Sequence, residues 1–187
     1  MRNFLLAILA ILTITSVTAQ TQVGDATLPN EMTMEGTKLV LNGAGLRKKA
    51  GFLKLYAGGL YLSSKSSDAN AIINADETMS MKLHITSKLV SAKRMISAVD
   101  DGFDSSLNGN TAAMSDKIEK FKSFFSDEIV RGNVFDIAYV KGKGSVVYKN
   151  GTEVGVIEGL DFKKALFGIW LGDDPADDDL KEDMLGK

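Results

Sequence analysis

Arg47 is the strongest candidate for a functional residue in this sequence. It shortly precedes an apolar run, residues 52–62, that carries the tyrosines Tyr56 and Tyr61. A guanidinium binds carboxylates through charge-assisted and often bidentate hydrogen bonds. One such cation beside an apolar strand would suit a pocket for a hydrophobic anion. The competing interpretation is a surface arginine in a basic loop, because Lys48 and Lys49 follow it directly.

Other residue types give weaker signals for chemistry. His84 is the single histidine and the sequence contains no cysteine, which argues against a Ser-His-Asp triad, a multi-histidine metal site and a thiol nucleophile. The acidic run of residues 173–179 lacks the pattern of a calcium loop and is better explained by helix capping. Residues 43–45 lack the further glycine and lysine of a phosphate loop. We therefore predict no metal and no cofactor.

The element that carries Arg47 is predicted to be a hairpin within residues 37–62. Leu39 and Leu41 alternate with polar neighbours, which is typical of a half-buried strand. Asn42-Gly43 and Gly45 are expected to form the turn, since these residues adopt positive φ at low cost. The second strand is apolar on both faces, and its Gly58-Gly59 pair predicts a bulge or the close approach of another group.

The rest of the chain alternates between strand and helix patterns. Residues 20–35 are polar and are expected to form an arm. Period-2 spacing predicts strands at 79–86, 134–140, 145–149 and 152–158. Period-3.6 spacing predicts helices at 91–103, at 115–129 and from 161 and 177 onward. Asn150-Gly151 is a strong hairpin turn signal. The helix that begins near Asp161 carries Trp170 on its apolar stripe, and we expect this tryptophan in the core.

Composition and the N-terminal residues indicate export. Arg2, an apolar stretch over residues 4–12 and small residues ending at Ala19 predict a signal peptide at residues 1–19 and one domain at 20–187. The stretch is shorter than the ~20 residues of a membrane span, so no stable span is expected. The chain has 22 basic and 24 acidic residues, and its basic residues do not gather into a stripe. This argues against binding of nucleic acid. We expect a periplasmic or secreted protein.

Several motifs together resemble a known family. They are GAGLR at residues 43–47, GFLKLYAGGLYL at 51–62, Asn150-Gly151, and a C-terminal set comprising DF at 161–162, ALF at 165–167, IWLGD at 169–173 and Pro175. This combination resembles the chalcone isomerase superfamily, and its end is similar to that of bacterial chalcone-isomerase-like members. The resemblance implies an α+β fold, an open-faced β-sandwich in which a large antiparallel sheet is covered by a layer of helices.

The resemblance also implies two functions for Arg47. In the family's fatty-acid-binding branch, an arginine and a strand tyrosine hold a carboxylate, and Arg47 with Tyr56 resembles that pair. The ligand would be a small hydrophobic molecule such as a fatty acid. Candidate wall residues for its tail are Phe52, Leu60, Met95, Val99 and Phe103.

The alternative is a cofactor-free isomerase, an intramolecular lyase acting on an aryl ketone or another chalcone-like enone. Arg47 would then be catalytic and would stabilise the oxyanion. Plant isomerases carry a threonine where Tyr56 stands, and a tyrosine and an asparagine on the next helix, both of which residues 91–103 lack. A third, structural interpretation is that Arg47 only ties the hairpin to the acidic C-terminal segment.

Overall fold

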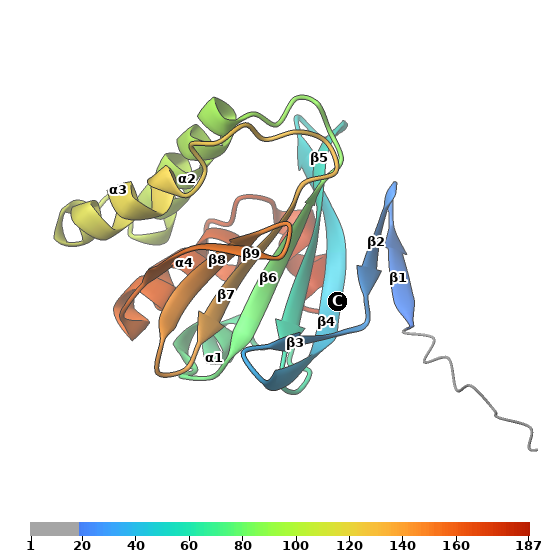
Figure 1. Cartoon of the computed structure of the whole chain (residues 1–187), viewed down its shortest axis with the longest axis horizontal. Helices are drawn as coiled ribbons and strands as arrows, with labels where there is room; N and C mark the ends of the chain where they lie inside the picture. Colours follow the sequence, from blue (N-terminus) through green and yellow to red (C-terminus); the bar gives the residue numbers. More distant parts are fainter. Residues whose placement is uncertain (1–18) are drawn as a thin grey trace, which may run out of the picture.

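The computed structural model describes residues 19–187, so all but the last residue of the predicted signal segment, residues 1–19, lies outside the described residues. Its main element is a seven-stranded antiparallel sheet in which the strands follow one another in chain order (Figure 1). The strands are β3 (Glu31–Met34), β4 (Thr37–Lys49), β5 (Leu53–Leu62), β6 (Met79–Ile85), β7 (Val134–Val140), β8 (Gly144–Lys149) and β9 (Thr152–Ile157). Because each strand pairs with its sequence neighbour, the sheet is a continuous meander.

Helices pack on one face of this sheet. They are α1 (Ala69–Asn74), α2 (Ala92–Ser106), α3 (Ser115–Ser123), α4 (Leu160–Leu171) and α5 (Asp178–Met184), with a short 3-10 helix at Ala112–Met114. The helices and the sheet face enclose one large apolar cluster, at whose centre Phe121 packs against the rings of Phe103, Phe125 and Phe162. The fold is therefore the α+β, open-faced arrangement expected from the sequence.

The opposite face of the sheet carries a small hairpin of β1 (Gln20–Val23) and β2 (Ala26–Pro29), which lies beside β4 (Figure 1). Val23, Ala26 and Leu28 pack there against Ala57 of β5. The expectation of a polar arm over residues 20–35 was wrong. These residues form three short strands: β1 and β2 pack Val23, Ala26 and Leu28 against the sheet, and β3 is an edge strand of the sheet with Met34 buried.

The turn of the central hairpin also differs from the prediction. β4 continues through Gly43 and Gly45 as far as Lys49, and the chain reverses at Ala50 and Gly51, with φ values of 52° and 75°. The two glycines are strand residues because helix α5 lies directly on them. An added Cβ at Gly43 would collide with the carbonyl oxygen of Asp183.

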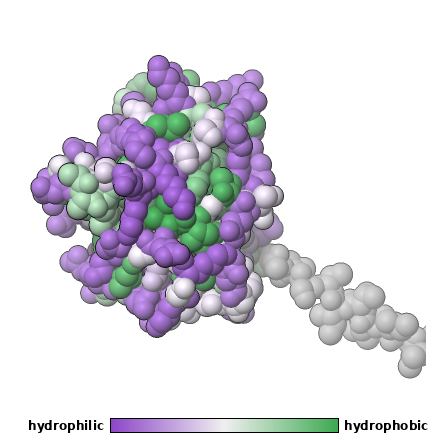
Figure 2. All heavy atoms as spheres, turned by 60° about the vertical axis from the view of Figure 1, so that its left-hand side comes forward, coloured by the Kyte–Doolittle hydropathy of each residue, from purple (hydrophilic) through white to green (hydrophobic). Residues whose placement is uncertain are grey.

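The predicted helix cap and hairpin turn, which depend on residues adjacent in sequence, were confirmed. The Ser91 side chain caps α2 by accepting a hydrogen bond from Arg94 N, and Asn150 and Gly151 turn β8 into β9 with φ values of 52° and 82°. Helix α3 ends at Ser123, earlier than expected. The surface in Figure 2 is mostly hydrophilic and broken by small apolar patches. In the part of the chain described, no helix is long and apolar enough to span a bilayer.

Candidate functional site

Arg47 and Tyr56 lie directly opposite each other on β4 and β5. Directly opposed residues on antiparallel strands share one face of the sheet, and Tyr56 belongs to the helix-covered core. The Tyr56 residue is 8% exposed, whereas the Arg47 side chain keeps 24% of its surface. The pair therefore places a partly accessible cation next to a buried phenol at the margin of the apolar core.

The Arg47 guanidinium is held by the C-terminal segment. Its Nη1 lies 3.1 Å from Oδ2 of Asp177 and also donates to the carbonyl oxygen of Lys48. The same Oδ2 accepts from the backbone nitrogen of Lys48 at 2.9 Å, while Oδ1 accepts from Leu180 N at 3.1 Å and caps α5. The ion pair expected from the structural interpretation of Arg47 is thus present, as is the expected capping role of an aspartate in this run.

The carboxylate of Asp177 is stabilised in its charged form. Burial alone would raise the pKa of Asp177, but the hydrogen bonds from Lys48 and Leu180 and the adjacent Arg47 charge outweigh burial and lower it. Asp177 therefore presents Arg47 with an ionised carboxylate, the same chemical group that a fatty acid would bring.

The Tyr56 phenol is positioned by helix α4. Nε1 of Trp170 donates to Oη of Tyr56 across 3.0 Å. Burial raises the pKa of Tyr56, an effect that the Trp170 hydrogen bond and the Arg47 charge only partly oppose. The phenol is neutral at ordinary pH, and accepting a bond from Trp170 leaves its own proton for a second partner.

The structure places most of the predicted wall residues in one core. Leu60 of β5 and Met95, Val99 and Phe103 of α2 share the cluster that contains Tyr56. Phe52 lies elsewhere, in the turn between β4 and β5, and is 74% exposed. It stands one residue before the strand begins, where side chains no longer alternate between the two faces.

Helix α5 covers the sheet next to Arg47 and Tyr56. Its Leu180 and Met184 are 1% and 0% exposed. Beneath the helix lie three glycines, Gly43, Gly45 and Gly58, which we call the glycine floor; Gly45 and Gly58 are directly paired. The close approach predicted for the Gly58-Gly59 pair is confirmed, because a Cβ on Gly58 would stand 2.6 Å from Cε of Met184.

Trp170, Leu180 and Met184 are the residues at this site that sequence reasoning did not assign to it, whereas Asp177 belongs to the acidic segment that the structural interpretation joined to Arg47. The acidic run was recognised as a capping segment, and the apolar stripe of α4 identified Trp170 as a core residue. Neither pattern predicts which strand residue these side chains contact. The glycine pair was the one signal that something approaches the sheet here.

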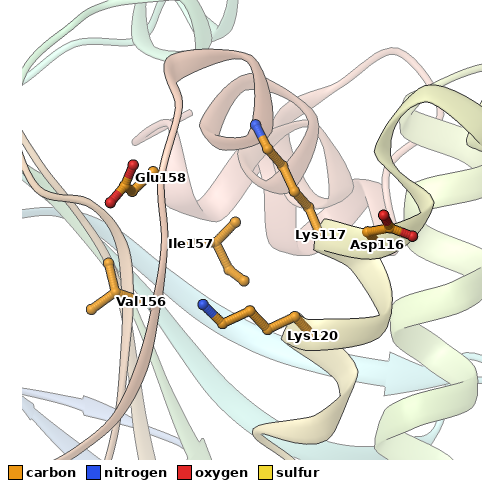
Figure 3. Close-up of a pocket in the computed structure, with 6 residues that line it drawn as sticks. All are labelled: Asp116, Lys117, Lys120, Val156, Ile157 and Glu158. Carbon is orange, nitrogen blue, oxygen red and sulfur yellow. The ribbon is translucent and has the colours of Figure 1, made fainter.

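A surface hollow of about 420 Å³ is formed by Asp116, Lys117 and Lys120 of α3 and by the chain from Val156 to Glu158 (Figure 3). It mixes both signs of charge and includes neither Arg47 nor Tyr56. Among the described residues, no group of three or more acidic, histidine or cysteine side chains is arranged to hold a metal ion. Arg47 with Tyr56 therefore remains the candidate site.

The arrangement defines an open-faced β-sandwich with a cation at the edge of its helix-covered core. A family profile described as chalcone isomerase-like matches residues 20–186, and the chain belongs to this chalcone isomerase-like family. No curated protein sequence matches it. Among solved structures, it is similar to a fatty-acid binding protein of Arabidopsis thaliana, with a TM-score of 0.67 and 19% identity over 86% of this chain and 91% of that one. At that identity the likeness establishes the fold.

Proposed function

We propose that the protein binds a small hydrophobic carboxylate such as a fatty acid, with Arg47 and Tyr56 receiving the head group. The observation that carries this proposal is that Arg47 already binds a carboxylate, that of Asp177, at 3.1 Å. A ligand carboxylate in the same place would keep the charge-assisted bond to Arg47. It would also accept a hydrogen bond from the hydroxyl of Tyr56, the residue directly opposite Arg47 on β5.

The tail of such a ligand would lie along the helix-covered face. Leu60, Met95, Val99 and Phe103 belong to the apolar core on that face and are at most 8% exposed, so the tail would have to replace part of their present packing. Each buried methylene contributes about 0.8 kcal/mol, so chain length should control affinity once the head group is fixed. The similar Arabidopsis structure, named a fatty-acid binding protein, supports this ligand class.

We further propose that binding is not followed by catalysis and that the protein works outside the cytoplasm. Helix α2 contains neither tyrosine nor asparagine, and a tyrosine stands at position 56 where the related isomerases have threonine. Export rests on the signal-like pattern of residues 1–19. N-terminal sequencing of the protein recovered from its native host should begin at about residue 20, whereas an intact N-terminus would contradict export.

Calorimetric titration with dodecanoate and with dodecanol tests the proposal, because the two probes share a tail and differ in the head group. The acid should bind about 10- to 100-fold more tightly, as expected for one charge-assisted hydrogen bond. Equal affinities, or no binding of the acid, would contradict a carboxylate site at Arg47. Incubation with a chalcone at high protein concentration should give no ring closure, and turnover would favour the isomerase instead.

A further inference from the structure

We propose that helix α5 autoinhibits this site, so that a ligand enters only when the helix leaves the glycine floor. The inference rests on the proposed function and adds its regulation. In this closed state Asp177 occupies the cation and the apolar side chains of α5 occupy the surface that a tail would cover. The segment from Asp177 to Met184 thus has the two parts of the ligand, a carboxylate followed by an apolar body.

The carboxylate of this segment, which resembles the head group of a ligand, lies at Arg47. Asp177 is an ionised carboxylate whose Oδ2 receives both the Arg47 guanidinium and the Lys48 backbone nitrogen. Its side chain is 10% exposed, so little solvent reaches this carboxylate. An incoming carboxylate can take the position on Nη1 of Arg47 that faces the Lys48 backbone nitrogen only by replacing that of Asp177.

The apolar side chains of α5 that resemble a ligand tail lie on the glycine floor. The pair Gly45–Gly58 stands two register positions from the pair Arg47–Tyr56, on the same face of the sheet. A Cβ on Gly58 would stand 3.3 Å from Cδ1 of Leu180 and closer still to Met184. Leu180 and Met184 cover Gly58, whereas the Asp183 side chain lies over Gly45 and the α5 backbone over Gly43. The strands without side chains therefore form a surface that begins at the cation, and α5 fills the space above it.

Helix α5 has the properties of an element that can leave. It has seven residues, fewer than an isolated helix needs to be stable, so its structure depends on its contacts with the sheet. Apart from Asp177, its polar links to the sheet are Asn42, which donates to the carbonyl oxygen of Met184 at 2.7 Å, and the exposed pair of Lys48 with Asp179.

Autoinhibition predicts that weakening the contacts of α5 strengthens ligand binding, since the observed affinity scales with the fraction of molecules that are open. Asp177→Asn is the sharpest variant. Asparagine caps a helix as well as aspartate does, so α5 keeps its N-cap while Arg47 loses its internal carboxylate. The control is Asp179→Asn, which makes the same charge change on the same helix at a side chain paired with Lys48 and 72% exposed.

A second pair of variants acts on the floor. Gly43→Ala forces α5 away, because the new Cβ collides with the Asp183 carbonyl. Gly155→Ala, on β9 at the other edge of the sheet, introduces a comparable collision with the Phe124 ring and leaves α5 in place. Circular dichroism and urea melts identify which variants are folded, and Asp177→Asn tests the proposal even if both alanine variants fail to fold.

Dodecanoate titrations and hydrogen exchange on the full chain decide the matter. Asp177→Asn and Gly43→Ala should bind dodecanoate about tenfold more tightly than wild type, and the two controls should not. Dodecanoate should also speed amide exchange in residues 178–185 of wild type. Autoinhibition would be overturned if wild type binds dodecanoate tightly and Asp177→Asn binds it equally or more weakly. It would also be overturned if dodecanoate slows amide exchange in α5. Either result would leave the proposed function standing. Absence of binding in every variant would overturn both.

Discussion

The indole nitrogen of Trp170 donates a hydrogen bond to the phenol oxygen of Tyr56, joining α4 to β5 across 114 residues of sequence. The nitrogen and oxygen are 3.0 Å apart, and both residues are at least nine-tenths buried. Trp170 is therefore both a core residue and the residue that positions the phenol of the candidate site.

Replacing Trp170 with phenylalanine should destabilise the protein by about 1 to 3 kcal/mol, because the buried phenol loses a partner and the core loses volume. Urea unfolding of Trp170→Phe, Tyr56→Phe and the double variant measures the coupling between the two side chains. We expect the double variant to lose less than the sum of the single losses. Additive losses would mean that the hydrogen bond contributes nothing to stability.

The phenylalanine cluster under α2, α3 and α4 should dominate the stability of the helix layer. Phe121 is fully buried and its ring centroid lies 5.3 Å from that of Phe125. Phe121→Ala should cost about 3 to 5 kcal/mol. Phe52→Ala is the matched control: its side chain is 74% exposed, and its loss should change the midpoint of urea unfolding very little. Similar losses for both variants would contradict the burial described here.

Much of the fold follows from patterns that act over a few residues. Alternation of apolar and polar side chains identified β6 and the β7–β9 meander, and Ser91 and Asn150-Gly151 marked a helix start and a turn. The resemblance through residues 43–62 then indicated how these elements assemble. These signals work because caps, turns and alternation depend on neighbours in sequence.

The errors arise where distant residues decide the structure. Gly43 and Gly45 favour a turn locally, yet they are strand residues because α5, some 140 positions later, packs on them. The alternation of β5 suggested an inward Phe52, but the strand begins at Leu53. The partners of the site, Asp177 and Trp170, lie 130 and 114 residues from Arg47 and Tyr56, and no local pattern encodes such pairs.

Lys163 should be a structural cation whose loss releases α1. The residue is fully buried, and its Nζ donates to the carbonyl oxygens of Ile72, Ile73 and Ala75 at 2.7 to 2.9 Å. Lys163→Met leaves these carbonyls without their donor and should cost about 1 to 3 kcal/mol. Urea melts at pH 7 measure this cost, and an unchanged midpoint would contradict the role assigned to the ammonium.

The same lysine gives a pH dependence with a definite sign. Burial, with a smaller contribution from Lys164, lowers the pKa of Lys163 to about 8, from an ordinary value of 10.5. Between these values the unfolded chain binds a proton that the folded chain has lost, so stability rises with pH. The free energy of unfolding of wild type, relative to Lys163→Met, should increase from pH 7.5 to 9.5. A decrease would show that the folded protein holds this proton more tightly.

Asp177 should stabilise the protein only while it is ionised. Its lowered folded-state pKa means that the unfolded chain takes up the proton first as the solution is acidified. The stabilisation is complete above the ordinary value of 3.8 and is lost as the pH falls through the lowered pKa. Urea melts of wild type and Asp177→Asn at pH 6 and pH 3 should converge at the lower pH. A difference that stays constant would contradict an ion pair with Arg47.

Arg47 is expected to receive the ligand carboxylate, and titrations of Arg47→Gln and Lys48→Gln with dodecanoate and with dodecanol provide the decisive test. Both variants remove one positive charge from neighbouring residues of β4. Because Arg47→Gln also releases Asp177 and so favours the open state, the quantity to compare is the ratio of dodecanoate affinity to dodecanol affinity. We expect Arg47→Gln to lower this ratio about 10- to 100-fold and Lys48→Gln to leave it unchanged. An equal ratio in wild type and Arg47→Gln, with both proteins folded, would contradict a carboxylate site at Arg47.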